Sequence, residues 1–224
     1  MAGPSRLLPG GHLLTQVSVP RYSHCLIGAS TDRQDFYHQA SVSAERWRHN
    51  AIGPALPLSA FEDLSPEGLA DLSSSRPQRP LCDRSGGDGF GRPRPSVLVA
   101  QPESYFGCFR SLFQGDHAGV EFATAAHADL LSSAGLLGDQ SRLLGGHPVP
   151  RTSPWQGLVI DDYFALSVEP LPASGLPVDS VSSSLVSKAK AAYQAEGVKG
   201  SDHKDVFDSA LLQAVGASVD SSRE

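Results

Sequence analysis

The sequence is poor in cysteine and has no long apolar run, and both features restrict its class. It holds 3 cysteines in 224 residues, an odd number without metal-ligand spacing, which indicates a reduced protein without a disulfide framework. Its first residues lack the basic segment and apolar core of a signal peptide. No apolar run approaches the roughly 20 residues that cross a bilayer. We therefore expect no membrane partner and an intracellular location, cytoplasmic or nuclear.

The chain also lacks an excess of positive charge. Its net charge of −6 argues against strong nonspecific binding to nucleic acid by this chain alone. A hydrophobic content of 40% allows a core, whereas 22 Gly and 17 Pro indicate long irregular segments. We predict a flexible N-terminal tail over residues 1–20, a folded core over 21–224, and a disordered insertion over 65–96 that is rich in Ser, Gly and Arg-Pro pairs.

Two short apolar runs surround a pair of acidic residues, Asp161 and Asp162. Residues 158–160 and 164–166 are predicted to be buried strands with Asp161-Asp162 at the turn between them. An acidic tip of this kind can hold a divalent cation, because hard ions such as Mg²⁺ take carboxylate oxygens. The alternative is an ordinary solvated polar turn.

A third carboxylate, Asp32, follows a predicted strand over residues 23–29. A carboxylate at a strand end is exposed on a rigid backbone and can serve a ligand, although an Asp in a turn or helix cap looks the same in sequence. Apolar residues at helical spacing predict a helix over 119–131, on which His127 reads as a satisfied core residue. A second helix is predicted over 182–196, with caps among residues 182–184 and a stop at Gly197. Closing strands are expected over 211–219.

Several segments, taken in order, resemble the palm motifs of reverse transcriptases of retroelements. They are Asp32–Val42, the Gln114-Gly115 pair before a helix, Val159–Asp162, Gly197–Lys204 and Ala214–Ser221. The resemblance implies an α+β fold, a polymerase palm-like antiparallel sheet backed by helices, with long irregular insertions.

The resemblance also implies roles for individual residues. Asp32, Asp161 and Asp162 would hold two Mg²⁺ ions, or Mn²⁺, for template-directed nucleotidyl transfer. Lys204 would donate a proton or contact phosphate, and the alternative for it is an ordinary solvated lysine. Tyr37 would lie beneath the sugar, or it is a core aromatic. Gln114 and Gly115 would line the nucleotide pocket. The implied partners are a template–primer and a deoxynucleoside triphosphate.

The chain departs from the family pattern at several positions. Val159 stands where an aromatic is usual, Arg33 where an apolar residue is usual, and Phe113 where Pro is usual. The chain on either side of the motifs is too short for fingers and thumb, so we expect a fragment or a decayed copy, with other chains supplying those parts. Two hypotheses remain open: a polymerase palm, and a non-catalytic interaction or remnant protein that keeps only the palm scaffold.

Overall fold

The computed structural model describes residues 7–17, 19, 23–47, 51–57, 60, 104–108, 111–112, 118–173, 175 and 177–221. The chain forms two compact units, one of Met1–Val42 with Ser111–Glu224 and the other of Ser43–Arg110. The predicted disordered insertion at 65–96 lies outside the described residues, as does the Gln114-Gly115 pair.

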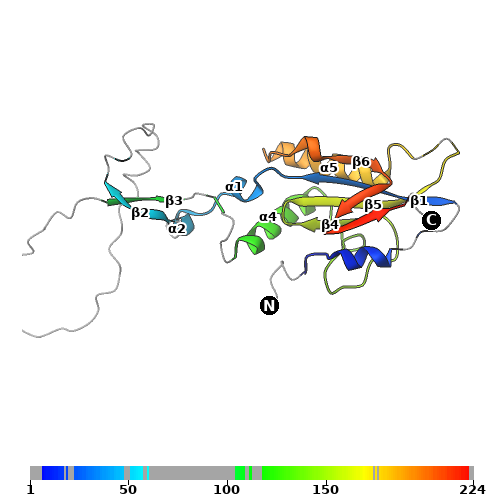
Figure 1. The fold of residues 1–224 in the computed structure, drawn as a ribbon, viewed down its shortest axis with the longest axis horizontal. Helices are drawn as coiled ribbons and strands as arrows, with labels where there is room; N and C mark the ends of the chain where they lie inside the picture. The colour runs from blue at the N-terminus through cyan, green and yellow to red at the C-terminus, as the bar shows by residue number, and fades with distance from the viewer. Residues whose placement is uncertain are drawn as a thin grey trace, which may run out of the picture. The chain divides into compact units, whose positions relative to one another are not determined.

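A four-stranded antiparallel sheet forms the centre of the first unit (Figure 1). Its order is β4-β5-β1-β6, and its strands are β1 (His24–Asp32), β4 (Trp155–Val159), β5 (Asp162–Pro170) and β6 (Val206–Ser209). β1 pairs with β5 along its whole length, from His24 opposite Pro170 to Asp32 opposite Asp162. The predicted strands near Leu26, Leu158 and Phe164 are therefore confirmed.

Two 15-residue helices complete the topology of this unit. Helix α4 (Gly119–Ser133) connects the region after β1 to β4, and helix α5 (Val181–Ala195) connects β5 to β6. The order β1-α4-β4-β5-α5-β6, with β5 and β1 central, is a split βαβ arrangement in which each helix crosses between strands that do not pair with each other. The unit is a mixed α and β fold with an antiparallel sheet, as predicted, and both helices lie within about two residues of their predicted bounds.

One face of the sheet packs against the two helices. Alternate residues of a strand point to opposite faces, so Ala29, Tyr163 and Ala165 share this face. They form a buried cluster with Leu131 of α4 and with Val186, Ala189 and Tyr193 of α5. All of these side chains are almost fully removed from water. This layer fixes β1 and β5 against the helices and so holds both strand ends that carry acidic residues.

The opposite face of the sheet is covered at one end by irregular chain and a small hairpin. The hairpin pairs β7 (Leu211–Ala214) with β8 (Ala217–Asp220). These two strands correspond to the closing strands predicted over 211–219. Buried residues here include Leu26, Phe164, Leu166 and Leu212. A 3-10 helix, η2 (Gly11–Gln16), lies within the region predicted as a flexible tail, with Leu13 buried and Leu14 packed against this cluster. The spacing of Leu13 and Leu14 among Gly and Pro had given no helical pattern.

The second unit is described in part and is treated by itself. It holds the short helix α2 (Ala44–Trp47) and an antiparallel pair of strands, β2 (Ala51–Pro57) and β3 (Ser104–Cys108). In the first unit, the chain leaves and returns at adjacent points, because Ser41 bridges Ser111 and the Leu112 amide donates to the Ala40 carbonyl at 2.9 Å. The second unit is thus an insertion between β1 and α4.

The ends of α5 follow from local sequence. Ser180 is the N-cap, and its hydroxyl accepts a hydrogen bond from the Ser183 amide at 3.2 Å, so the caps predicted at 182–184 were wrong because the helix begins earlier. Gly197 follows the helix with φ +69°, a conformation that favours glycine and stops the helix as predicted. No helix within the described part of the chain is both long and apolar enough to cross a membrane.

Candidate functional site

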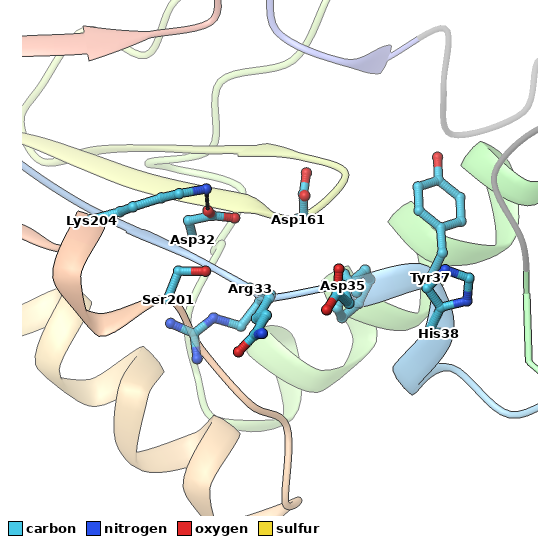
Figure 2. Close-up of a pocket in the computed structure, with 10 residues that line it drawn as sticks. Asp32, Arg33, Asp35, Tyr37, His38, Asp161, Ser201 and Lys204 are labelled. Carbon is cyan, nitrogen blue, oxygen red and sulfur yellow. Dashed lines mark hydrogen bonds and ion pairs between the residues drawn. The ribbon is translucent and has the colours of Figure 1, made fainter.

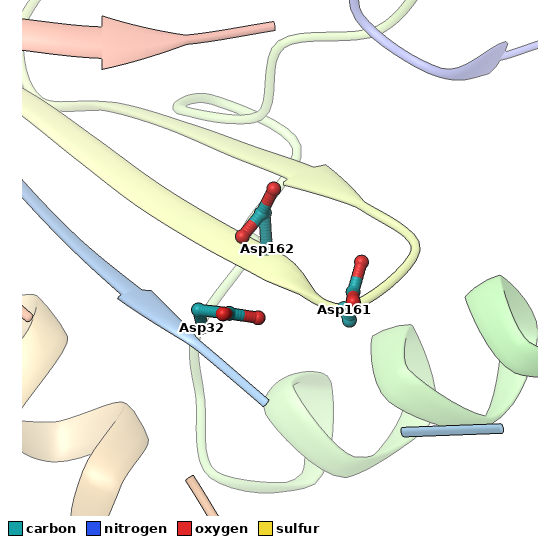
Figure 3. Close-up of side chains that lie close together, drawn as sticks. All are labelled: Asp32, Asp161 and Asp162. Carbon is teal, nitrogen blue, oxygen red and sulfur yellow. The ribbon is translucent and has the colours of Figure 1, made fainter. Parts of the chain in front are cut away.

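Three carboxylates meet at one end of the sheet (Figure 3). Asp32 is the last residue of β1, Asp162 is the first residue of β5, and the two are directly paired across the strands. Asp161 lies in the turn that precedes β5. Each residue offers one oxygen, and these oxygens lie within 4.8 Å of one another. The sequence placed both Asp161 and Asp162 in the turn, whereas the turn consists of Ile160 and Asp161.

The tight turn between β4 and β5 requires an unusual backbone. Ile160 has φ +54°, a left-handed conformation that costs an L-residue roughly 1–2 kcal/mol and is rare for a β-branched side chain. Two hydrogen bonds hold the turn in place. The Arg33 amide donates to the Asp161 carbonyl at 3.1 Å, and the Ile160 carbonyl accepts from His127 Nδ1 at 2.7 Å. The carboxylates of Asp161 and Asp162 are therefore carried by a backbone that is bonded on both sides.

Burial and mutual repulsion both disfavour negative charge in this cluster. Burial, followed by the charges of Asp161 and Asp32, raises the pKa of Asp162 to about 6. Asp162 is exposed as a residue, but protein around its carboxyl group still displaces water. Burial and, more weakly, the charge of Asp32 also raise the pKa of Asp161. Such a cluster favours a cation, because a cation stabilises the charged form of every carboxylate.

Lys204 already supplies one positive charge to this cluster. Its Nζ forms an ion pair with Asp32 Oδ2, and this hydrogen bond with Asp32 raises the pKa of the Lys204 ammonium group. Lys204 ends the 3-10 helix η4 (Asp202–Lys204). The turn before it is fixed by two bonds, from the Ser201 amide to the Asp32 carbonyl at 3.0 Å and from the Lys204 amide to the Ser201 carbonyl at 2.7 Å. Lys204 is thus positioned at the site by its pairing with Asp32, although 58% of its side chain is exposed to solvent.

A pocket of about 320 Å³ opens beside the carboxylates (Figure 2). Small-molecule sites occupy roughly 300–1,000 Å³, so the volume suits a small ligand. Tyr37, on the short helix α1 (Phe36–Gln39), is half-buried and lines this pocket. Burial and then the nearby charge of Asp161 raise the pKa of its phenol. The pocket is lined by Asp32, Arg33, Gln34, Asp35, Phe36, Tyr37, His38, Asp161, Ser201 and Lys204.

Behind the pocket, a buried carboxylate ties β1 to α5. The side chain of Asp205 is 3% exposed. Its Oδ1 accepts from the Thr31 hydroxyl at 2.6 Å, and its Oδ2 forms an ion pair with Lys190 of α5. Thr31 also accepts from the Arg33 guanidinium. Thr31 and Arg33, the two neighbours of Asp32 in the sequence, are thus both fixed by side-chain bonds. The same bonds fix Asp205, the residue that follows Lys204.

Arg33 is a buried cation beside the acidic cluster. Its guanidinium stacks on the Tyr193 ring, 4.1 Å from the centroid, and only 3% of the residue is exposed. The chain makes room for it at Gly200, because a Cβ there would lie 2.5 Å from the guanidinium. The sequence marked Arg33 only as a departure and gave no signal for its partners. Asp205, Thr31 and Tyr193 were missed as well, since long-range side-chain pairs leave no local pattern.

The structure thus brings together Asp32, Asp161, Asp162, Lys204 and Tyr37 of the predicted site. Gln114 and Gly115 lie outside the described residues, and their predicted role stays a prediction. No protein-family model matches the chain, and no curated protein matches it significantly. What the site can do is therefore argued from its own residues.

Proposed function

We propose that this chain is the palm of a template-directed polymerase, similar to that of reverse transcriptases, and that it carries out nucleotidyl transfer. The observation that carries the proposal is the meeting of Asp32, at the end of a central strand, with Asp161 and Asp162, at the tip of the neighbouring hairpin. These residues are more than 120 positions apart in sequence. The resemblance was drawn from the order of the motifs alone, so their convergence is independent support.

The residues at this site suit divalent cations. Carboxylate oxygens are the ligands that Mg²⁺ and Mn²⁺ prefer, and the raised pKa values of Asp161 and Asp162 are those expected of carboxylates that gain from a cation. Asp32, Asp161 and Asp162 would hold the ions. Two bound ions would activate a primer hydroxyl and neutralise charge on the phosphates.

The other residues of the site would bind and orient the substrates. The Lys204 ammonium group has donors beyond the one given to Asp32 and lines the pocket, where it can contact a phosphate or donate a proton. Tyr37 forms the pocket wall on which a sugar would rest. The substrates would be a template–primer and a deoxynucleoside triphosphate.

A metal titration tests the cluster without requiring template, primer or nucleotide. The free energy of unfolding of the wild-type chain should rise with Mg²⁺ or Mn²⁺, by about 1.4 kcal/mol at ten times the Kd. Asp161→Asn should abolish this rise. Asp129→Asn is the matched control, because Asp129 is an exposed carboxylate on α4 away from the cluster, and it should keep the rise. Identical metal responses in all three proteins would favour the non-catalytic scaffold.

A primer-extension assay tests the chemistry itself. The chain, with a primed template, deoxynucleoside triphosphates and Mg²⁺, should extend the primer, and the double change Asp161→Ala, Asp162→Ala should remove extension. Asp129→Ala should leave it unchanged. Extension that survives the double change would show that these carboxylates do not catalyse it.

A further inference from the structure

We infer that His127 is a positioning residue for the acidic tip, holding the Ile160-Asp161 turn by a hydrogen bond from its Nδ1 to the Ile160 carbonyl. The importance of this residue for catalysis rests on the proposed function, because the tip carries Asp161 and Asp162, two of the proposed metal ligands. The sequence suggested only that His127 is a satisfied core residue, a reading that assigns no task to it.

The contacts of His127 determine which ring nitrogen carries the proton. A carbonyl oxygen can only accept, so Nδ1 is protonated and donates to Ile160 at 2.7 Å. In a neutral imidazole Nε2 must then accept, and the Tyr193 hydroxyl donates to it at 2.7 Å. The Ile160 carbonyl thus fixes the tautomer, and the Tyr193 hydroxyl, which can donate or accept, satisfies the remaining ring nitrogen. His127 and Tyr193 are both buried, so water does not compete for either bond.

The turn needs such a bond because its backbone is strained. Ile160 adopts φ +54°, and a relaxed turn would move the carboxylates that follow. α4 supplies His127 and α5 supplies Tyr193, while Phe36 packs against the imidazole at 4.7 Å between ring centroids. Arg33 joins the same arrangement by stacking on Tyr193 and by its amide bond to the Asp161 carbonyl. His127 thus holds the Ile160 carbonyl, and the Arg33 amide holds the Asp161 carbonyl. The side chains of both residues contact Tyr193.

The His127 imidazole is expected to stay neutral between pH 5 and pH 8. Burial, together with the charge of Arg33, lowers the pKa of His127 to about 4 even though the bond to Ile160 opposes this shift. A neutral ring with Nδ1 protonated is the state that the two hydrogen bonds require. ¹⁵N NMR of the imidazole should report this tautomer from pH 5 to pH 8, and an Nε2-protonated ring would overturn the inference.

Two substitutions separate the two bonds. The amide nitrogen of Asn reaches about the position of Nδ1, so His127→Asn can still donate to Ile160. The amide of Gln reaches about the position of Nε2, so His127→Gln keeps a hydrogen-bond partner for Tyr193 but loses the bond to the Ile160 carbonyl. His127→Phe makes neither bond while keeping an aromatic ring in the core.

The metal-free readout is amide hydrogen exchange. The Arg33 amide reports the turn directly, since it donates to Asp161, and the Ala29 amide in the middle of β1 reports the rest of the sheet. Exchange at Arg33 should be at least about tenfold faster in His127→Gln than in the wild type, and within about threefold in His127→Asn, with Ala29 unchanged in both. Equal exchange at Arg33 in the Gln and Asn variants would overturn the inference. If His127→Gln does not fold, faster exchange at Arg33 in His127→Phe supports the inference and unchanged exchange overturns it.

The second readout is Mn²⁺ binding, followed by electron paramagnetic resonance. His127→Gln should weaken Mn²⁺ binding by about tenfold, the order found when a residue that orients a metal ligand is lost, and His127→Asn should weaken it much less. If the wild-type chain binds no Mn²⁺, the proposed metal site fails, and the exchange experiment still decides the role of His127. The two failures are therefore distinguishable.

Discussion

Asp32 and Asp162 lie directly opposite each other on β1 and β5, so their side chains leave the same face of the sheet. Carboxylates in this arrangement repel, because opposite positions on adjacent strands bring their Cβ atoms to about 4.5–5.5 Å. The chain tolerates this repulsion at the edge of a pocket, where Lys204 forms an ion pair with Asp32. Removing one of the two charges should therefore have a measurable, pH-dependent effect.

Asp162→Asn should stabilise the metal-free protein at pH 7. The pKa of Asp162 is raised from 3.8 to about 6 in the folded chain, so the folded state keeps this proton to a higher pH than the unfolded state. The group consequently lowers stability as pH rises from about 4 to about 6, and the loss is complete above that range. After a discount for solvent screening, the gain on substitution is about 1 kcal/mol at pH 7 and vanishes near pH 4. Urea denaturation at each pH measures it.

His127 acts in the opposite direction in the same pH range. Its pKa is lowered from 6.5 to about 4, so its contribution to stability is lost as pH falls from about 6.5 to about 4. Because both proteins contain His127, its effect cancels in the difference between them. A gain from Asp162→Asn that is the same at pH 4 and pH 7 would show that charge is not its cause.

Gly157→Ala should destabilise the sheet by about 1–3 kcal/mol. Gly157 is paired with Phe164 across β4 and β5, and a Cβ at Gly157 would lie 2.1 Å from the Phe164 ring. The ring, which is buried, would have to leave its place over the glycine. Gly138→Ala is the control, because its Cβ would meet only the Ser141 hydroxyl, at an ordinary 3.9 Å. Thermal denaturation should separate the two, and equal melting temperatures would contradict this account of the Phe164 ring.

Asp205→Asn should destabilise the protein by about 2–3 kcal/mol, since it leaves the Lys190 ammonium group with a neutral partner and disturbs the bond from Thr31. Asp202→Asn provides the comparison, because Asp202 also pairs with Lys190, at 3.0 Å, but its side chain is 78% exposed. Exposed ion pairs of this kind contribute little to stability, because water screens them. Chemical denaturation of both variants measures the contrast, and a larger loss for Asp202→Asn would reverse our ranking of the two pairs.

Ser180→Ala should destabilise the protein by about 1 kcal/mol by removing the N-cap of α5. Ser184→Ala changes the same residue type at an exposed position in the first turn of the helix, where Ala has the higher helix propensity, and should be neutral or slightly stabilising. Circular dichroism during urea denaturation follows both. If both substitutions have the same effect, the cap at Ser180 contributes nothing measurable.

The sequence was sufficient for the elements whose signals are local. The apolar runs on either side of Asp161 predicted β4 and β5, and the stripe that includes Leu131 predicted α4. The pairing of Asp32 with Asp162 could not be derived in this way, because strand register is fixed by the packing of both faces of the sheet. The motif resemblance grouped these residues without giving their geometry.

The side-chain contacts that support the site could not be predicted from local sequence patterns for a related reason. The bond from Thr31 to Asp205 joins residues 174 positions apart, and the sequence around either residue does not indicate the other as its partner. His127 gave a local signal, since it lies at a core-facing position of α4, but its bond to Ile160 depends on the left-handed turn. That turn was displaced by one residue in the prediction, because an Asp-Asp pair is a stronger turn signal than a β-branched Ile.

The space that Gly200 leaves for Arg33 has an evolutionary consequence. Arg33 occupies its buried place because position 200 carries no side chain, since a Cβ there would overlap the guanidinium and force it to shift. The two positions should therefore be coupled: a small apolar residue at 33 leaves room for Ala or Ser at 200, whereas a side chain at 200 forces Arg33 to move from its place on Tyr193. Arginine at position 33 is thus easiest to acquire in a chain that already carries glycine at position 200.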